Sequence, residues 1–329
     1  MKARAFWVAE PGRGELRTES LPEVGADQVL VRALFSGVSR GTEALVFRGE
    51  VPESQHERMR CPHQAGRFNE AVKYGYISVG TVERGCGLEN RNVFCLHPHQ
   101  DRYVVDRTAL TLLPEGMDPG LGVLAANMET AVNGVWDAQP NTTDRVTVIG
   151  AGVVGALVAW RMQSFVDAPV ELVDTRPDRK ALADALGLTF AVPDDAQSNR
   201  SIVVHASGSE AGLCRALELA DDDGRIIEMS WYGDRKVSVP LGEDFHSRRL
   251  TIQCSQVGAI PPHMRETHGF SDRMAVVLDL LCSHPELGAL INSESAFETL
   301  PELMPRLALG ASEVLCHRVC YPEEPPCTD

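Results

Sequence analysis

The sequence predicts an α/β protein with a doubly wound parallel sheet and a second, discontinuous domain rich in β-strands. In mid-chain, a glycine-rich turn at 146–155 joins an apolar strand to an apolar helical pattern, and strands and helices alternate after it. Residues 1–125 instead carry short alternating runs, such as 28–35 and 76–82, between Gly, Pro and polar turns. Alternating strands and helices give a parallel sheet, whereas short alternating runs indicate a β-rich domain.

The mid-chain turn carries a dinucleotide-binding fingerprint. Gly150, Gly152 and Gly155 follow the G-x-G-x-x-G spacing between a strand and a helix. The first glycine permits a tight turn, the second lets the backbone approach a pyrophosphate, and the third lets helix and strand pack closely. The positive end of the helix then attracts the pyrophosphate. We therefore expect a Rossmann-type domain, in which the turn contacts the cofactor through Gly150, Gly152, Val153, Val154 and Gly155.

A second apolar strand ends at Asp174, which predicts a preference for NAD(H). This acid lies nineteen residues after Gly155, where the fingerprint places the residue that binds the ribose hydroxyls. Its carboxylate would also repel the 2′-phosphate of NADP(H), whereas Arg176 could favour that phosphate. We expect NAD as the cofactor and NADP as the second choice, with Thr175 also close to the ribose.

Composition limits the classes of function. The 329 residues include 31 basic and 46 acidic side chains, which gives a net charge of −15 and disfavours a nucleic-acid partner. The N-terminus lacks a signal-peptide pattern, and no apolar run is long enough to span a membrane. The nine cysteines are odd in number and scattered. This usage predicts reduced thiols in a cytoplasmic protein.

The elements after the fingerprint define the expected domains. Helices are predicted over 180–186, 210–219 and 272–281, with a helix-like segment near 300–308, and strands over 201–205, 223–231, 249–257 and 316–321. Because the fingerprint lies in mid-chain, we predict a dinucleotide-binding domain over 127–259. Residues 1–126 and 260–329 would together form the other domain.

Two predicted strands end in residues that we expect on the nicotinamide side. In an open α/β sheet, the ligand lies beyond the carboxyl ends of the strands. Ala206 and Ser207 follow one strand, and Ser230 and Trp231 end another. We predict that all four line the cofactor site.

This order of features resembles the medium-chain dehydrogenase/reductase superfamily, the alcohol dehydrogenase-like enzymes with a GroES-like catalytic domain. The likeness covers nearly the whole chain and includes 23–33, 80–85 and 250–258 besides the fingerprint. The segment 36–43 is most similar to the branch that contains bacteriochlorophyllide dehydrogenases. The resemblance implies that the β-rich domain is GroES-like and that the protein is an NAD(H)-dependent oxidoreductase of a small-molecule alcohol or carbonyl.

The positions at which such relatives bind catalytic zinc carry other residues here. Ser39 replaces a cysteine, Tyr76 replaces the histidine of a Gly-His-Glu motif, and Ala126 takes the place of the third ligand. The four-cysteine lobe of the structural zinc site is also missing. Because catalytic zinc needs about three protein ligands with N, S or carboxylate donors, we expect neither family zinc site.

One metal alternative remains open. Cys95, His97 and His99 alternate, so on a regular strand they would share one face and could bind a transition metal. Pro98 disturbs regular strand pairing, and such residues more often pack or form hydrogen bonds. We therefore expect no metal at this place.

Without zinc, side chains must handle the proton or negative charge of the reacting oxygen. Tyr76 is the first candidate, because its phenol could donate a proton; the alternative is a core aromatic. The resemblance implies that Thr42 is the hydroxyl that relays a proton to the substrate. It also implies that Glu43 is the acid that follows this hydroxyl in relatives, where it usually has a structural role. His97 or His99 could act as an acid or base, because imidazole titrates near neutral pH.

The resemblance also implies two arginines that assist the cofactor. Arg40 and Arg318 occupy basic positions of relatives, and a guanidinium suits bidentate contacts with phosphate. For each of them, a surface ion pair is the alternative.

Three functions are compatible with these residues. The first is an NAD(H)-dependent oxidoreductase that interconverts an alcohol and a carbonyl without catalytic zinc. The second is a zinc-free reductase of a quinone or enone double bond, although such relatives usually use NADPH. The third is an NAD(H)-binding or redox-sensing protein that has lost catalysis. The resemblance further implies a homodimer formed through the edge near 250–256.

Overall fold

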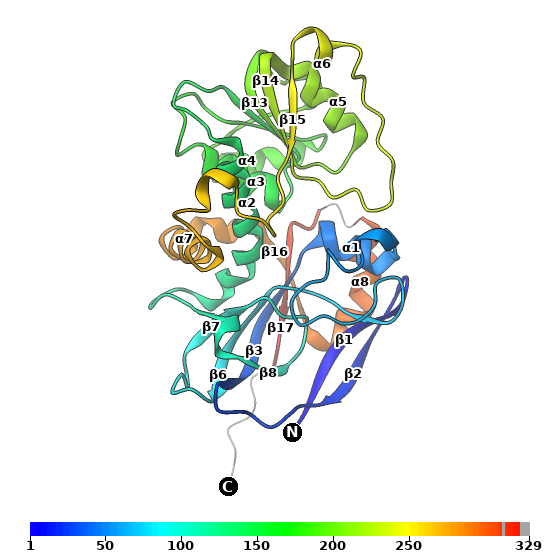
Figure 1. Ribbon diagram of the computed structural model, residues 1–329, viewed down its shortest axis with the longest axis vertical. Helices are drawn as coiled ribbons and strands as arrows, with labels where there is room; N and C mark the ends of the chain where they lie inside the picture. Colours follow the sequence, from blue (N-terminus) through cyan, green and yellow to red (C-terminus); the bar gives the residue numbers. More distant parts are fainter. Residues whose placement is uncertain (311–312, 323–329) are drawn as a thin grey trace. The chain divides into compact units, whose positions relative to one another are not determined.

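The computed structural model describes residues 1–310 and 313–322, which fold as two units (Figure 1). Unit 1 contains Met1–Ala126 and Leu278–Asp329, and unit 2 contains Asn127–Val277. The chain passes between the units within helix α2 (Ala125–Ala138) and again within helix α7 (Phe270–Ser283). The return to the first unit therefore comes later than residue 260, and the segment 260–277 belongs to unit 2.

Unit 2 is built on a six-stranded sheet with the order β12-β11-β10-β13-β14-β15. Each neighbouring pair is parallel. The chain starts in the middle, builds outward to β12 and then restarts at β13, which is the Rossmann order. The predicted parallel sheet is thus confirmed. Its strands are β10 (Val146–Ile149), β11 (Glu171–Val173), β12 (Thr189–Ala191), β13 (Arg200–His205), β14 (Ala220–Glu228) and β15 (Thr251–Cys254).

Helices pack along this sheet and bury its apolar side chains. Helix α3 (Val153–Met162) contacts β10 and β11, α4 (Lys180–Ala185) contacts β12, and α5 (Glu210–Leu219) contacts β13 and β14. A short helix, α6 (Asp244–Ser247), precedes β15. The helix predicted at 210–219 has these bounds, whereas β14 begins before the predicted strand and ends before Trp231.

Unit 1 contains two sheets. The smaller has the order β2-β1-β5-β4; the larger has the order β16-β17-β3-β6-β7-β9, with β8 paired to β3. All pairs are antiparallel except β16 with β17. The strands are β1 (Lys2–Glu10), β2 (Arg13–Ser20), β3 (Gln28–Val38), β4 (Ala65–Gly66), β5 (Val72–Lys73), β6 (Ser78–Arg84), β7 (Asn92–Cys95), β8 (Arg102–Asp106), β9 (Leu110–Leu112), β16 (Ile291–Ala296) and β17 (Cys316–Cys320).

The C-terminal segment completes the larger sheet, because β17 pairs with β3 (Figure 1). Helix α8 (Leu300–Leu309) lies before β17 and packs against α1 (Arg40–Arg48). The sequence analysis missed β16 (Ile291–Ala296). Only its first and last residues, Ile291 and Ala296, are apolar, and the four residues between them are polar. Its pairing with β17, rather than its composition, makes it a strand.

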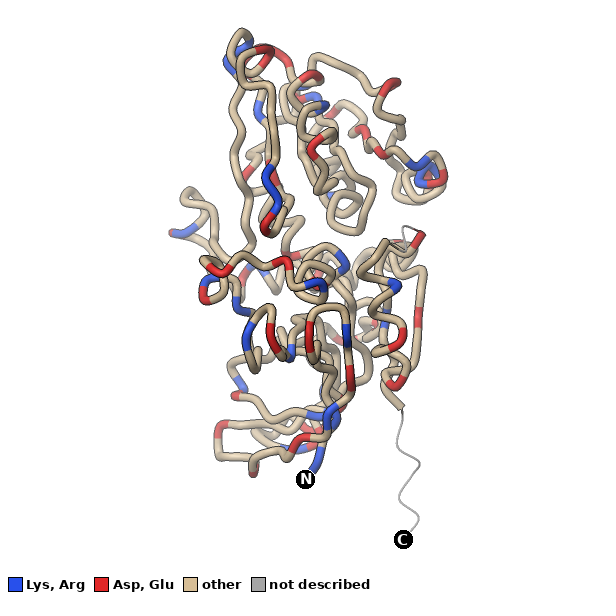
Figure 2. The backbone as a smooth tube through the Cα atoms, turned by 90° about the vertical axis from the view of Figure 1, so that its right-hand side faces the viewer, with Lys and Arg blue, Asp and Glu red and all other residues tan. Residues whose placement is uncertain are grey.

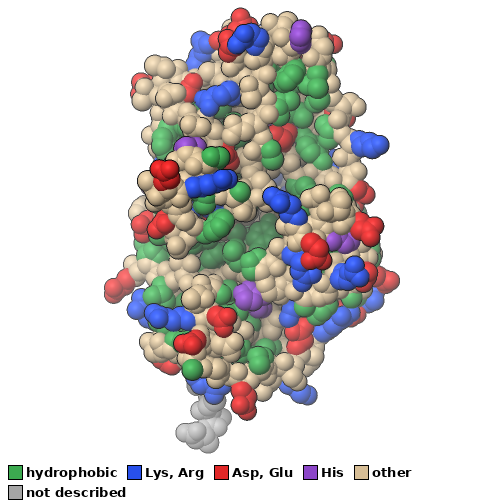
Figure 3. Space-filling view, in the orientation of Figure 1, with side chains coloured by type: hydrophobic (Ala, Val, Ile, Leu, Met, Phe, Trp, Pro, Cys, Tyr) green, Lys and Arg blue, Asp and Glu red, His purple; other side chains and the backbone are tan. Residues whose placement is uncertain are grey.

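Charged residues of both signs are spread along the backbone of each unit (Figure 2), and charged side chains of both signs are spread over the face seen in Figure 3. The excess of acidic residues is therefore not gathered into one segment. Within residues 1–310 and 313–322, none of the helices has the length and apolar composition that crossing a bilayer requires.

Candidate active site

The glycine turn of unit 2 has the geometry that an anion needs. Gly150 has a φ of +109°, and a Cβ there would lie 2.7 Å from the backbone nitrogen of Ser207. A Cβ on Gly155 would lie 1.9 Å from the carbonyl oxygen of Gly150, so only glycine allows this packing. Around Gly152 the space is open, and this N-cap residue offers no side chain to the first N–H groups of α3. The turn therefore fits a pyrophosphate at the helix N-terminus.

Asp174 follows β11 and links the glycine turn to the next loop. Its Oδ2 accepts a hydrogen bond from the backbone N–H of Ala151 at 2.7 Å, and its Oδ1 accepts one from Arg176 at 2.9 Å. The guanidinium of Arg176 pairs with Asp178 at 2.6 Å. Each carboxylate oxygen has further acceptor capacity, which suits ribose hydroxyls.

Polar side chains gather at the carboxyl ends of β13 and β14. His205 is fully buried, with its Nδ1 2.7 Å from Oε2 of Glu228 and its Nε2 2.6 Å from Oγ of Ser207. The hydroxyl of Tyr232 donates to Glu228 Oε2 at 3.1 Å, and the backbone N–H of Ser230 donates to Oε1 at 2.7 Å. Burial alone would raise the pKa of Glu228, but its hydrogen bonds with His205 and Ser230 lower it, so this carboxyl is ionised at neutral pH.

The sequence analysis missed His205 and Glu228 as functional candidates. The two residues are register partners in the β13–β14 pairing, and only this pairing places their side chains together. The available signal was an ionisable residue directly after the apolar run that ends each strand, 202–204 in β13 and 226–227 in β14. The other predicted cofactor residues lie in the first turn of α3, in the loop after β11, and after β13 and β14: Val153, Val154, Thr175, Ala206 and Trp231.

In unit 1, the structure brings three of the predicted catalytic residues together. The Tyr76 hydroxyl donates to Oγ of Ser39 at 2.6 Å and also hydrogen-bonds Thr42. Glu43 lies in the first turn of α1, and its Oε1 accepts a hydrogen bond from the backbone N–H of Ser39 at 2.8 Å. Burial, and then the charge of Glu43, raise the pKa of Tyr76 to about 12. The phenol therefore keeps its proton at neutral pH.

The other oxygen of Glu43 begins a buried chain of polar groups. Glu43 Oε2 lies 2.8 Å from Nε2 of His99, and His99 Nδ1 lies 2.7 Å from Oγ of Ser36. Ser36 Oγ is in turn 3.0 Å from the hydroxyl of Tyr321. Because both oxygens of Glu43 are engaged, this carboxylate positions the start of α1 and the His99 ring.

His97 lies in a different environment from Tyr76. Its ring stacks on Tyr103, with centroids 3.8 Å apart and an interplanar angle of 11°, and its Nδ1 lies 2.9 Å from the carbonyl oxygen of Pro98. Burial lowers the pKa of His97 well below its ordinary value. A neutral imidazole packed on an aromatic ring is the arrangement of a core residue.

We expect His97→Gln to make the protein less sensitive to acid. As the pH falls below about 6.5, the unfolded chain protonates this histidine but the folded protein does not. The associated stability is present above that pH and is lost at up to about 1.4 kcal/mol per pH unit below it. Urea unfolding at pH 7.5 and pH 5 should show a smaller difference for His97→Gln than for the native protein. His284→Gln, at a half-buried site where the ring pairs with Glu286, is the control, and equal pH dependence in both variants would contradict this role.

The residues at the zinc-ligand positions of relatives do not fit a metal ion. Ser39 and Tyr76 are hydrogen-bonded directly to each other, and Ala126 offers a buried methyl group. A serine hydroxyl and a protonated phenol are not the donors that zinc prefers.

The alternating Cys95, His97 and His99 do not share a strand face. Strand β7 ends at Cys95, His97 stacks on Tyr103, and His99 pairs with Glu43. In the part of the chain that the structure describes, no group of three His, Cys, Asp or Glu residues is arranged to hold a metal ion.

The two predicted phosphate-binding arginines have protein partners within unit 1. Arg40 donates to the carbonyl oxygen of Val314. Arg318 donates to Glu294 and lies over the ring of Phe35, 5.0 Å from its centroid. A phosphate role for either arginine rests on the resemblance alone.

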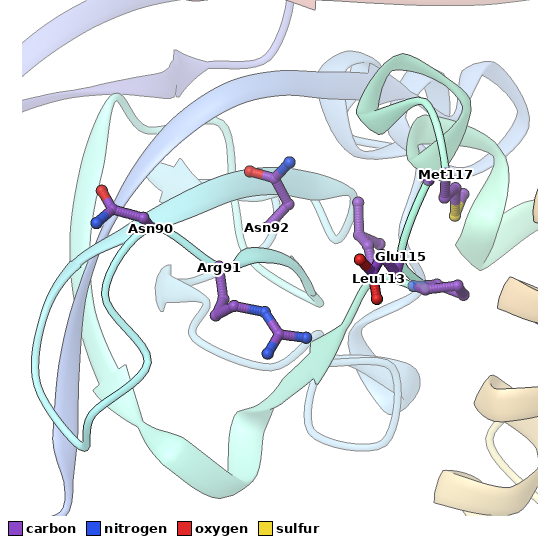
Figure 4. A pocket seen from close by; sticks show the side chains of 8 residues that line it. Asn90, Arg91, Asn92, Leu113, Glu115 and Met117 are labelled. Atoms are coloured by element: carbon purple, nitrogen blue, oxygen red, sulfur yellow. The ribbon is translucent and has the colours of Figure 1, made fainter.

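A polar pocket in unit 1 lies outside this candidate site (Figure 4). It lies between the loop at 90–92 and the turn at 113–117. The predicted catalytic and cofactor-binding residues are not among those that line it. Its lining consists of Asn90, Arg91, Asn92, Leu113, Pro114, Glu115, Gly116 and Met117.

Comparisons with known proteins support the resemblance at the level of fold. No family model matches the sequence. The chain is 24% identical over 165 residues to the uncharacterized zinc-type alcohol dehydrogenase-like protein YphC of Escherichia coli, an alignment that covers 46% of this chain and 47% of that protein. The aligned part thus spans about half the length of this curated relative.

Solved structures match nearly the whole chain. L-idonate 5-dehydrogenase from Escherichia coli has a TM-score of 0.79 at 13% identity and covers 97% of this chain and 98% of its own. A Sinorhizobium meliloti dehydrogenase bound to NADP and an Escherichia coli alcohol dehydrogenase complexed with NADH each have a TM-score of 0.76 at 15% identity, covering 97% of this chain and 99% of theirs. The chain therefore has the fold of the medium-chain dehydrogenases, a GroES-like unit and a Rossmann unit, and the predicted resemblance is confirmed at the level of the fold.

Proposed function

We propose that this protein is an NAD(H)-dependent oxidoreductase that interconverts an alcohol and a carbonyl without a catalytic zinc. The observation that carries the proposal is the glycine turn, whose packing requires Gly150 and Gly155 and whose helix N-terminus is open for a pyrophosphate. Asp174 supports NAD(H) over NADP(H), because its carboxylate accepts hydroxyl hydrogen bonds and repels a phosphate. Solved structures with the same fold hold NADP or NADH.

Tyr76 is the proposed proton donor. A nicotinamide cofactor, when bound, would supply or accept the hydride. The Tyr76 hydroxyl would give its proton to the carbonyl oxygen during reduction, and the hydroxyls of Ser39 and Thr42 would then stabilise the phenolate. Glu43 holds the Ser39 backbone, and with it the acceptor of the Tyr76 hydroxyl.

A panel of substrates tests this function. NADH and NADPH oxidation should be followed with aldehydes, ketones, quinones and enones. Turnover of aldehydes or ketones with NADH supports the proposal, whereas turnover of quinones or enones alone would identify a double-bond reductase. Tight NADH binding without turnover of any compound would instead indicate a redox-sensing protein.

Purified protein should contain no stoichiometric zinc. The hydrogen-bonded pair of Ser39 and Tyr76 lacks the donors that a catalytic zinc needs. Elemental analysis after dialysis against zinc-free buffer checks this, with a zinc-containing alcohol dehydrogenase treated in parallel. One zinc per chain would overturn the zinc-free part of the proposal.

We also propose a cytoplasmic homodimer. Strand β15 lies at the edge of the unit 2 sheet, and an uncovered edge strand tends to pair with another chain. The eight cysteines that the structure describes are all free thiols, which supports a reducing compartment. Light scattering should give the mass of two chains.

A further inference from the structure

Three side chains in unit 2 form a continuous hydrogen-bonded chain from the interior to the surface. Glu228 Oε2 lies 2.7 Å from His205 Nδ1, and His205 Nε2 lies 2.6 Å from Ser207 Oγ. His205 and Glu228 are buried, whereas Ser207 is exposed. A carboxylate, an imidazole and an accessible hydroxyl thus follow one another in that order.

The surrounding groups fix the role of each member. Glu228 is ionised and can only accept hydrogen bonds, so the Nδ1 of His205 carries a hydrogen toward it. In the neutral ring, Nε2 is then an acceptor that faces the hydroxyl of Ser207. Tyr232 and the backbone of Ser230 hold the carboxylate in place.

The first turn of α5 lies directly beside this hydroxyl. A Cβ on Gly212 would be 2.3 Å from Ser207 Oγ, so glycine is what allows the helix start to approach so closely. The N-terminus of this ten-residue helix is positive and can stabilise negative charge that develops next to it. A hydroxyl, a base and an electropositive backbone therefore meet at one place.

We propose that Ser207 is a nucleophile activated by His205 and Glu228, and that it accepts the acyl group of a small ester. The arrangement has the relations of a serine–histidine–acid triad, which is recognised by geometry and roles rather than by position in the sequence. This second activity does not rest on the proposed oxidoreductase function.

The reaction balances without any further cofactor. Ser207 Oγ forms a bond to the ester carbonyl carbon while its proton passes to Nε2 of His205. The ester C–O bond then breaks, and the same proton goes to the leaving alcohol, which leaves an acyl group on Ser207. Water, deprotonated by His205, hydrolyses that acyl-enzyme to a carboxylic acid and restores the hydroxyl.

A fluorophosphonate probe tests the nucleophile directly in the cofactor-free protein. Ser207 Oγ should displace fluoride and gain one phosphonyl group per chain, which intact mass and peptide mapping locate. Ser207→Ala should abolish this label, whereas Ser238→Ala, at another exposed serine of unit 2, should keep it. No label on the native protein, or a label on another residue, would overturn the proposal.

Two further variants separate an activated Ser207 from a serine that only supports Ser209, the N-cap residue of α5, through hydrogen bonds. His205→Gln and Glu228→Gln should each slow labelling, the former by about 100-fold or more, because general-base assistance contributes at least that factor. Thermal unfolding by circular dichroism selects the variants that remain folded. If His205→Gln unfolds, the labelling rate of Glu228→Gln alone tests whether Ser207 is activated. The rate of p-nitrophenyl acetate hydrolysis, compared between the native protein and Ser207→Ala, gives a second measurement. Native-like labelling rates in the folded variants would overturn the proposal and leave Ser207 with the structural role of a hydrogen-bond partner of Ser209.

Discussion

Replacing Tyr76 with phenylalanine should lower kcat for carbonyl reduction by about 100- to 10,000-fold, the range that a positioned general acid contributes. The substitution removes one oxygen, the hydroxyl that donates to Ser39 at 2.6 Å, and leaves the ring in place. Because burial and Glu43 raise the pKa of Tyr76 to about 12, the native phenol remains protonated throughout the neutral range.

Steady-state kinetics with NADH and the best aldehyde or ketone measure this effect. NADH affinity should not change, because the glycine fingerprint, which is the proposed cofactor site, lies in the other unit. Tyr74→Phe is the matched control, since Tyr74 is a buried neighbouring tyrosine whose ring lies 6.0 Å from that of Tyr76. If Tyr76→Phe retains native kcat, this phenol is a core aromatic and another group supplies the proton.

Replacing Asp174 with alanine should raise the Kd for NADH by about 10- to 100-fold and leave NADPH affinity nearly unchanged. Hydrogen bonds to a charged group are worth about 1.5–3 kcal/mol, and each 1.4 kcal/mol is tenfold in affinity. The same change removes the repulsion of a 2′-phosphate, which offsets the loss for NADPH. Nicotinamide fluorescence titration of both cofactors gives the ratio of the two Kd values.

The structural role of Asp174 requires a second variant. Its carboxylate also accepts the backbone N–H groups of Ala151 and Arg176, so alanine could loosen the turn for every nucleotide. Asp174→Asn keeps an oxygen acceptor but removes the charge, and should narrow the preference for NADH with a smaller loss of affinity. Asp178→Ala, at the exposed acid that pairs with Arg176, is the control. An unchanged NADH-to-NADPH ratio in Asp174→Ala and Asp174→Asn would refute the cofactor assignment.

The sequence determined the architecture of unit 2, because that architecture is encoded locally. Gly150, Gly152 and Gly155 mark a strand–turn–helix, and the structure has that turn at that place, with a packing that requires glycine at Gly150 and Gly155. The apolar runs and the helix at 210–219 follow from periodicity, which neighbouring residues alone set. The sequence also showed that Ser39, Tyr76 and Ala126 differ from the zinc ligands of relatives, once the resemblance had given the positions of those ligands.

Only the tertiary structure decided which polar groups meet. Strand β16 exists because β17 lies beside it, and its sequence gives no apolar alternation. His97 and His99 are two residues apart, yet one stacks on Tyr103 and the other pairs with Glu43, because β7 ends before both. His205 and Glu228 meet only through the register of two parallel strands. Contacts of this kind join residues far apart in the chain, and a local pattern cannot specify them, because they depend on how the strands pair and where each one ends.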